Sequence, residues 1–195
     1  MIAAVEDLLS ETVLRRIVAV VRPELTIWQV VRRNGSGYLR TRARDFNRTA
    51  QSVPVFMLAD QDRAEVCPAE LIATWLGVPP APKLLFRVAV MEIESWIMAD
   101  RRAFAGFLSI REDAIPENPD SVPSPKELIV SLAKKSRRRD IREDLVPSRG
   151  STATVGPAFN ARLGEFVVTA WDPTRAAEGS ASLMKAVVRL RSAFR

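Results

Sequence analysis

Short apolar runs alternate with stretches of helical character along the first two thirds of the chain. The apolar runs, which predict buried β-strands, lie at 2–5, 25–31, 53–59 and 84–91. The stretches between them predict helices at 8–21, 38–52 and 69–76, the first with apolar residues at every third or fourth position. Strands that alternate with helices in this way are typical of βαβ units around a parallel sheet. The pattern therefore predicts an α/β fold with a mostly parallel, four-stranded sheet.

The last part of the chain is predicted to be helical and to follow a linker. A helix at 93–107 is expected to be interrupted or capped near Asp100. Four of the 13 prolines lie in 111–125 and predict a linker there. Helices are expected at 126–136, 158–170 and 181–194, and the last carries an apolar stripe of Leu183, Val187, Leu190 and Phe194. We therefore divide the chain into an α/β core, 1–110, and a proline-rich linker followed by a helical extension packed on the core, 111–195.

The absence of histidine limits the chemistry more than any other feature of the composition. The 195-residue chain has no histidine and one cysteine, Cys67, which excludes triads with a histidine base, histidine-ligated zinc, intrachain disulfides and cysteine-rich metal sites. Any reaction must use carboxylates, Lys, Arg, Ser, Thr or the single tyrosine, Tyr38. No apolar run reaches the roughly 20 residues of a membrane span, and residues 1–7 lack the basic start of a secretory signal. We expect a cytoplasmic protein without membrane association.

The formal charge of +6 is concentrated in two basic segments. Between 32 and 48 there are six arginines and one acidic residue, Asp45, and a second cluster, KKSRRR, occupies 134–139. Clustered basic residues are typical of proteins that bind the phosphates of DNA or RNA, although solvated helix faces carry the same pattern. The residues predicted to contact nucleic acid are Arg40, Arg42, Arg44, Arg48, Arg137, Arg138 and Arg139.

Carboxylates follow three of the four predicted strands at the point where each strand ends. In the order of the first, third and fourth strands they are Glu6 with Asp7, Asp60 with Asp62, and Glu92 with Glu94. Because the carboxyl ends of parallel strands meet at one edge of a sheet, these groups would repel one another unless a cation or protons intervened. Carboxylate oxygens suit Mg²⁺ or Mn²⁺. The sequence therefore predicts a divalent-metal site, with the preference of acidic residues for helix N-termini as the alternative explanation.

The order of these residues resembles a known arrangement. A Glu after the first strand, an Asp-x-Asp after a later strand and a further acid downstream are similar to the TOPRIM domain of topoisomerases, primases and the overcoming-lysogenization-defect (OLD) nucleases. More closely, the segments VEDLLSE at 5–11, ADQD at 59–62 and EIESWIMAD at 92–100 resemble a family of small bacterial TOPRIM-like proteins of unassigned function. The resemblance covers about residues 4–100. It implies a three-layer TOPRIM/Rossmann-like fold with a helical C-terminal extension.

The resemblance also implies roles for individual residues. Glu6 corresponds to the TOPRIM glutamate, a metal ligand or general base, and Asp7 stands where the family usually has glycine. Lys126 is the candidate for the basic residue near the scissile phosphate. The implied ligands of Mg²⁺ or Mn²⁺ are Glu6, Glu11, Asp60, Asp62 and Glu94, and the implied catalytic residues are Glu6, Asp60, Asp62 and Lys126.

The function implied by the resemblance is that of a metal-dependent nuclease, the effector subunit of an ATPase-associated defence system. The chain has no Gly-x-x-x-x-Gly-Lys-Ser/Thr loop, so an ABC-type ATPase partner would be encoded separately. The alternative function is a catalytically degenerate TOPRIM subunit that docks such an ATPase or nucleic acid. A receiver-like signalling domain also places acids beyond parallel strands, but it requires a single phospho-acceptor Asp and fits Asp60 with Asp62 less well. A homodimer is compatible with each of these functions.

Overall fold

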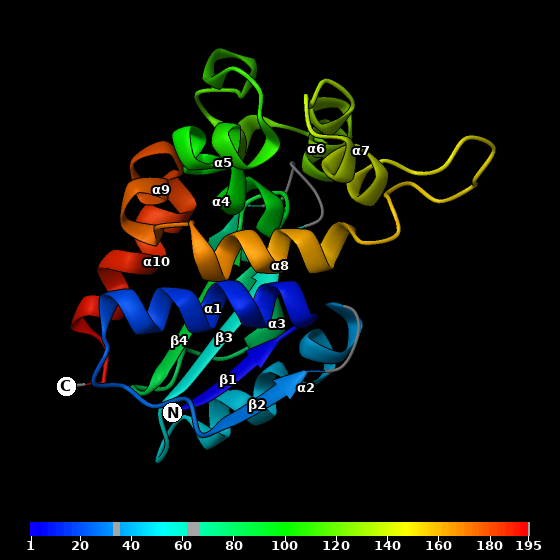
Figure 1. Ribbon diagram of the computed structural model, residues 1–195. Coiled ribbons are helices and arrows are strands. Elements are labelled where there is room, and N and C mark those ends of the chain that lie inside the picture. The colour runs from blue at the N-terminus through cyan, green and yellow to red at the C-terminus, as the bar shows by residue number, and fades with distance from the viewer. Residues whose placement is uncertain (33–35, 62–66, 195) are drawn as a thin grey trace.

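The computed structural model describes residues 1–32, 36–61 and 67–194 (Figure 1). Two short 3₁₀ helices, Glu112–Ala114 and Pro119–Ser121, lie in the proline-rich segment. In chain order the other elements are β1 (Ile2–Val5), α1 (Leu8–Val21), β2 (Gln29–Arg32), α2 (Ser36–Thr49), β3 (Val55–Asp60), α3 (Pro68–Leu76), β4 (Leu84–Ala89), α4 (Ile93–Ala99), α5 (Arg101–Leu108), α6 (Pro125–Lys134), α7 (Arg139–Leu145), α8 (Phe159–Thr169), α9 (Pro173–Gly179) and α10 (Ala181–Ser192).

The four strands form one parallel sheet in the order β2-β1-β3-β4. The predicted α/β class and four-stranded parallel sheet are therefore confirmed. The chain leaves β1 toward β2 on one side and returns past β1 to β3 on the other. The strand order thus reverses between β1 and β3, and ligands of open α/β sheets bind outside the carboxyl ends of the strands at this point.

Helices cover both faces of the sheet and make it the middle of three layers, as in Rossmann-like folds (Figure 1). Alternate residues of β3 divide between the two faces, as the pleat of a strand requires. Phe56 and Leu58 join the core under α1, α8 and α10, whereas Met57 and Ala59 pack with α2 and α3. Both faces of β3 are buried, which explains its continuous apolar sequence.

The helices of the second half pack on the α/β part through one continuous core. Val5 and Phe56 share a cluster of buried side chains with Leu163 of α8 and Leu190 of α10. Helices α4 to α7 lie beyond the carboxyl ends of the strands (Figure 1). In the described part of the chain, no helix has both the length and the hydropathy that a membrane crossing requires.

Several element bounds differ from the sequence predictions for physical reasons. β2 covers only Gln29–Arg32 rather than 25–31, because its partner β1 is four residues long and pairs from Ile2 opposite Gln29. The helix expected at 93–107 is divided at Asp100, as predicted. The sequence analysis missed α7 and α9, which have seven residues each and are too short to show a clear helical period.

Candidate acidic site at the carboxyl edge of the sheet

The point where the strand order reverses brings together the first two predicted acidic residues. Glu6 directly follows β1, and Asp60 is the last residue of β3. The Oε1 atom of Glu6 accepts a hydrogen bond from the backbone N–H of Asp60 at 3.0 Å. Asp7 has a separate structural role, because its Oδ1 accepts the Ser10 N–H at 2.8 Å and caps the N-terminus of α1.

The turn from β4 into α4 adds Glu94 to this edge. Met91 in this turn has φ = 65°, a left-handed backbone conformation that costs energy in a non-glycine residue. Glu94 lies in the first turn of α4 and is only 1% exposed. Its Oε2 atom is buried and has no hydrogen-bond partner. A buried carboxylate oxygen without a donor is costly, and a proton or a bound cation would relieve this cost.

Lys126 reaches the same cluster from the first turn of α6. Its Nζ atom lies 2.9 Å from Oε1 of Glu92 and 3.6 Å from Oε1 of Glu94. The Lys126 backbone N–H also donates to Oε2 of Glu92 at 3.2 Å. Glu92 therefore holds both ends of the lysine, and the ammonium group is the counter-ion of the buried Glu94.

Burial and crowding of carboxylates determine the protonation of this site. Burial, together with the negative charges of Glu94 and Glu6, holds the pKa of Asp60 well above its ordinary value. Burial raises the pKa of Glu94 to about 7, although the positive charge of Lys126 acts in the opposite direction. Burial by itself would lower the pKa of Lys126, but Glu94 and Glu92 outweigh this effect and the pKa lies above the ordinary value. The cluster therefore binds protons or cations more readily than exposed carboxylates do.

A small cleft opens next to the lysine. It has a volume of about 180 Å³ and lies between the turn into α4, the start of α6 and the segment before α8. Glu92, Lys126 and Glu127 line it together with Thr154 and Val155. The Lys126 ammonium group is thus accessible from solvent, whereas the carboxylate of Glu94 behind it is not.

The carboxylate oxygens at this edge are the kind of ligand that a hard divalent cation prefers, but the described side chains are not grouped closely enough to hold one. Glu6, Asp60 and Glu94 supply carboxylate oxygens, the ligands preferred by Mg²⁺ and Mn²⁺, and Oε2 of Glu94 lacks a partner. Asp62, the fourth predicted ligand at this edge, lies outside the described residues. Within 1–32, 36–61 and 67–194, no three acidic, histidine or cysteine side chains are grouped closely enough to hold a metal ion.

The remaining predicted ligand, Glu11, is engaged elsewhere. Its Oε1 accepts a hydrogen bond from Nε of Arg15 at 2.8 Å, and its Oε2 lies 3.4 Å from Nε of Arg32. Arg15 is one helical turn further along α1, and Arg32 ends β2. Two guanidinium groups thus neutralise Glu11, and no contact in the described residues joins it to Glu94 or Lys126.

The predicted nucleic-acid residues differ in whether acidic side chains neutralise them. On α2, Arg42 and Arg48 both form ion pairs with Asp45, whereas Arg40 and Arg44 have no acidic partner among the described residues. At the start of α7, Arg138 pairs with Asp140 and Arg139 with Glu143, and the described residues contain no acidic partner for Arg137. The positive charge available to a polyanion is therefore smaller than the sequence predicts.

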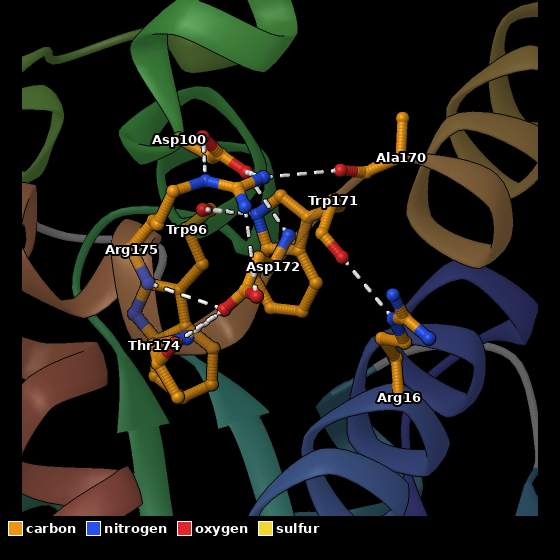
Figure 2. Close-up of polar contacts among 8 residues, drawn as sticks. All are labelled: Arg16, Trp96, Asp100, Ala170, Trp171, Asp172, Thr174 and Arg175. Carbon is orange, nitrogen blue, oxygen red and sulfur yellow. Dashed lines mark hydrogen bonds and ion pairs between the residues drawn. The ribbon is translucent and has the colours of Figure 1, made fainter.

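A polar network that the sequence analysis missed fixes α4, the helix that carries Glu94 (Figure 2). Asp100 at the end of α4 is 3% exposed, and Arg175 of α9 donates to it from Nε at 3.2 Å and from Nη2 at 2.7 Å. Trp171 Nε1 donates to the Trp96 carbonyl at 3.1 Å. Arg175 and Trp171 each lie 75 residues along the chain from their partners, so no local sequence pattern connects them. The only signal in the sequence was the presence of Trp96 and Asp100 in the segment ESWIMAD at 94–100.

Comparisons with protein-family models, with curated protein sequences and with solved structures found no match to this chain. The similarity of residues 5–11, 59–62 and 92–100 to TOPRIM-like proteins therefore stays a prediction from the sequence.

Proposed function

We propose that the protein is a Mg²⁺- or Mn²⁺-dependent nuclease that hydrolyses phosphodiesters of DNA or RNA at the acidic site. One observation carries the proposal: Glu6, Asp60, Glu94 and Lys126 come from four separate segments and lie at the carboxyl edge of the sheet, near enough for their charges to act on one another. Carboxylates whose pKa values are raised by burial and by one another are typical of functional sites. The resemblance to TOPRIM-like proteins supports the same function.

Each residue has a distinct part in this chemistry. Glu6, Asp60 and Glu94, with Asp62 by the resemblance, would hold the cation, which when bound supplies positive charge to the phosphate and acidifies water. Lys126, at the cleft, binds a non-bridging phosphate oxygen and orients the phosphodiester. Glu6 accepts the proton of the attacking water. The burial of Glu94 excludes bulk water from the rear of the site and strengthens these charge interactions.

The partners belong to the same proposal. Basic side chains of α2 and of the segment before α7 that lack an acidic partner contact phosphates of the nucleic acid. The resemblance alone supports a separately encoded ABC-type ATPase and a role in defence, with this chain as the effector subunit in the cytoplasm.

A specific observation favours a second function, a binding subunit that docks nucleic acid or an ATPase without cutting. The Lys126 ammonium group already neutralises Glu94 and Glu92, as a cation would. The described residues also contain no preformed group of three metal-binding side chains. In this function the charged cluster stabilises the turn into α4.

A cleavage assay separates the two functions. Supercoiled, linear and single-stranded substrates are incubated with the wild-type protein in Mn²⁺, in Mg²⁺ and in EDTA. The nuclease is expected to cut with metal, to stop in EDTA and to lose activity in Glu6→Gln, which keeps the size of the side chain but removes its charge. Glu127→Gln, at the rim of the same cleft, is the matched control and is expected to cut normally. Absence of wild-type cleavage, with metal bound and a partner ATPase added, would favour the binding subunit.

A further inference from the structure

A second polar hollow lies between α2 and α3, on the face of the sheet opposite α1. It has a volume of about 310 Å³ and is lined by Arg40, Thr41, Arg44, Thr74 and Trp75. Two cationic side chains, two hydroxyl groups and an aromatic ring therefore surround a single space. This combination is suited to an anionic ligand that carries a flat group, because guanidinium groups bind phosphates in a fork and tryptophan offers an apolar surface.

The two arginines of this hollow are held near each other without an acidic partner. Arg40 and Arg44 are one helical turn apart on α2, a spacing at which like charges destabilise a helix by roughly 0.2–0.5 kcal/mol. No ion pair or hydrogen bond of either guanidinium group occurs in the part of the chain that the structure describes. On the same helix, Arg42 and Arg48 share Asp45 as a common partner. Within the described residues, both guanidinium groups are therefore available to an anionic ligand.

The guanidinium group of Arg44 lies beside the glycine that ends α3. Gly77 has φ = 65° and ends α3 with a hydrogen bond from its N–H to the Ala73 carbonyl. A Cβ atom at this position would lie 2.6 Å from Nη2 of Arg44, so the guanidinium group lies directly against the end of α3. The positive φ of Gly77 by itself favours glycine at this position.

The frame around the hollow is rigid. Asn47, only 4% exposed, joins α2 to the segment after α3: its Nδ2 donates to the Pro79 carbonyl at 3.1 Å, and its Oδ1 accepts the Ala81 N–H at 2.7 Å. Trp75 is partly buried and packs against Phe86 of β4, with ring centroids 5.7 Å apart. The ring of Trp75 is therefore supported from the core side, and α2 is tied to the segment after α3.

We infer that the hollow between α2 and α3 binds a backbone phosphate of single-stranded nucleic acid through Arg40 and Arg44, with the adjoining sugar or base against Trp75. This inference rests on the proposed function for the identity of the ligand. α2 begins at the carboxyl edge of the sheet, after β2, so Arg40 and Arg44 lie on a helix that starts at the edge where β1 and β3 also end. Phosphates alternate with aromatic bases in nucleic acid, and the hollow pairs guanidinium groups with an aromatic ring in the same way.

The test compares two double variants with equal loss of charge from the same helix. Arg40→Gln/Arg44→Gln removes the two arginines of the hollow, and Arg42→Gln/Arg48→Gln removes two that are paired with Asp45. Affinity for a fluorescein-labelled single-stranded oligonucleotide is measured in EDTA, which prevents cleavage, between about 50 and 300 mM salt. The slope of log affinity against log salt is expected to fall in magnitude by about 1.4 in the first variant, at about 0.7 for each lost contact. The control variant is expected to change it by less than half as much.

A third variant, Trp75→Phe, tests the aromatic contact independently of charge. It is expected to weaken oligonucleotide binding while leaving the salt slope unchanged, because no phosphate contact is lost. Circular dichroism and thermal unfolding of all variants verify that each is folded. Weaker binding of Trp75→Phe with a reduced salt slope would contradict the division of roles between the ring and the arginines.

Two outcomes would overturn the inference, and a third would separate it from the proposed hydrolysis. Equal slopes in the two double variants would show that the arginines of the hollow are no different from any others on α2. Displacement of the oligonucleotide by poly-glutamate at equal charge concentration would replace nucleic acid by an acidic protein segment as the ligand. If Arg40→Gln/Arg44→Gln binds weakly as expected but the wild type cuts no substrate with metal, the hydrolysis proposed above fails and the phosphate site stands.

Discussion

Replacement of Glu94 by glutamine gives the most direct test of the acidic site, because it requires no substrate and no metal. Glu94 is 1% exposed, its Oε2 has no hydrogen-bond donor, and its pKa is about 7 against an ordinary value of 4.5. The folded protein therefore binds the proton more tightly than the unfolded chain does. Stability from this group is fully present below the unfolded pKa of 4.5 and is lost as the pH rises toward 7.

The size of the effect follows from the displacement of the pKa. At about 1.4 kcal/mol for each pKa unit, a rise from 4.5 to about 7 corresponds to about 3 kcal/mol. The positive charge of Lys126 is already included in this value, because it acts on the ionised form of Glu94. Glutamine has nearly the same shape as the protonated acid but cannot ionise. Glu94→Gln is therefore expected to match the wild type near pH 4.5 and to be more stable by about 3 kcal/mol above pH 7.

Urea unfolding in EDTA, at several values between about pH 4.5 and 8.5, measures this difference. Asp60 is present in both proteins, but the charge of Glu94 is one cause of its raised pKa. The pKa of Asp60 therefore falls in the variant, which adds to the gain in stability at high pH. Glu127→Gln removes a carboxylate from an exposed position near the cleft, and its difference from the wild type gives the effect of net charge alone. A Glu94→Gln variant that gains no stability as the pH rises would refute the burial of an ionisable carboxyl group at this site.

Four further outcomes are expected. On the proposed function, Mg²⁺ or Mn²⁺ at 100 times its dissociation constant should stabilise the wild type by about 2.7 kcal/mol and Asp60→Asn much less. Equal shifts in melting temperature would remove Asp60 from the proposed metal site. Arg175→Met leaves the buried Asp100 without its ion pair and should lower the free energy of unfolding by about 2 kcal/mol. The loss is smaller than for a fully buried pair because Arg175 is half exposed. An unchanged urea midpoint would contradict this prediction. Gly164→Ala in α8, where a Cβ meets nothing within 4 Å, should stabilise by about 1 kcal/mol. Gly156→Ala should destabilise because its Cβ would lie 2.3 Å from a backbone oxygen, and the opposite order of the two glycine variants would contradict the packing around α8.

The architecture of the α/β part could be predicted because its signals are local. The strand β3 is apolar at every position from Val55 to Ala59, which reports burial on both faces, and the period of α1 reports a single buried stripe. The edge of the sheet to which Glu6 and Asp60 belong also follows from the sequence, since parallel strands end at the same edge. The division of the helix at Asp100 was predictable as well.

The assignment of partners within the site needed the tertiary structure. Glu11 has the spacing of a ligand in the sequence, yet its neighbours are Arg15 on the next turn and Arg32 on β2. Asp7 reads equally well as a site residue or a helix cap, and only the bond from Ser10 N–H identifies the cap. The sequence pattern reports which side chains are buried or charged, but not which opposite charge lies within reach.

The sequence by itself determined the alternation of strands and helices, the shared edge at which the strands before Glu6 and Asp60 end, and the exclusion of histidine chemistry. The strand order, and with it the reversal between β1 and β3, came from the structure. Only the tertiary structure decided that Lys126, 34 residues from Glu92, completes the acidic cluster, and that Arg175, 75 residues from Asp100, holds the helix behind it. The physical reason is the range of each interaction. Periodicity arises from neighbours along one element, whereas ion pairs between elements depend on how packed helices place distant side chains, which no local pattern records.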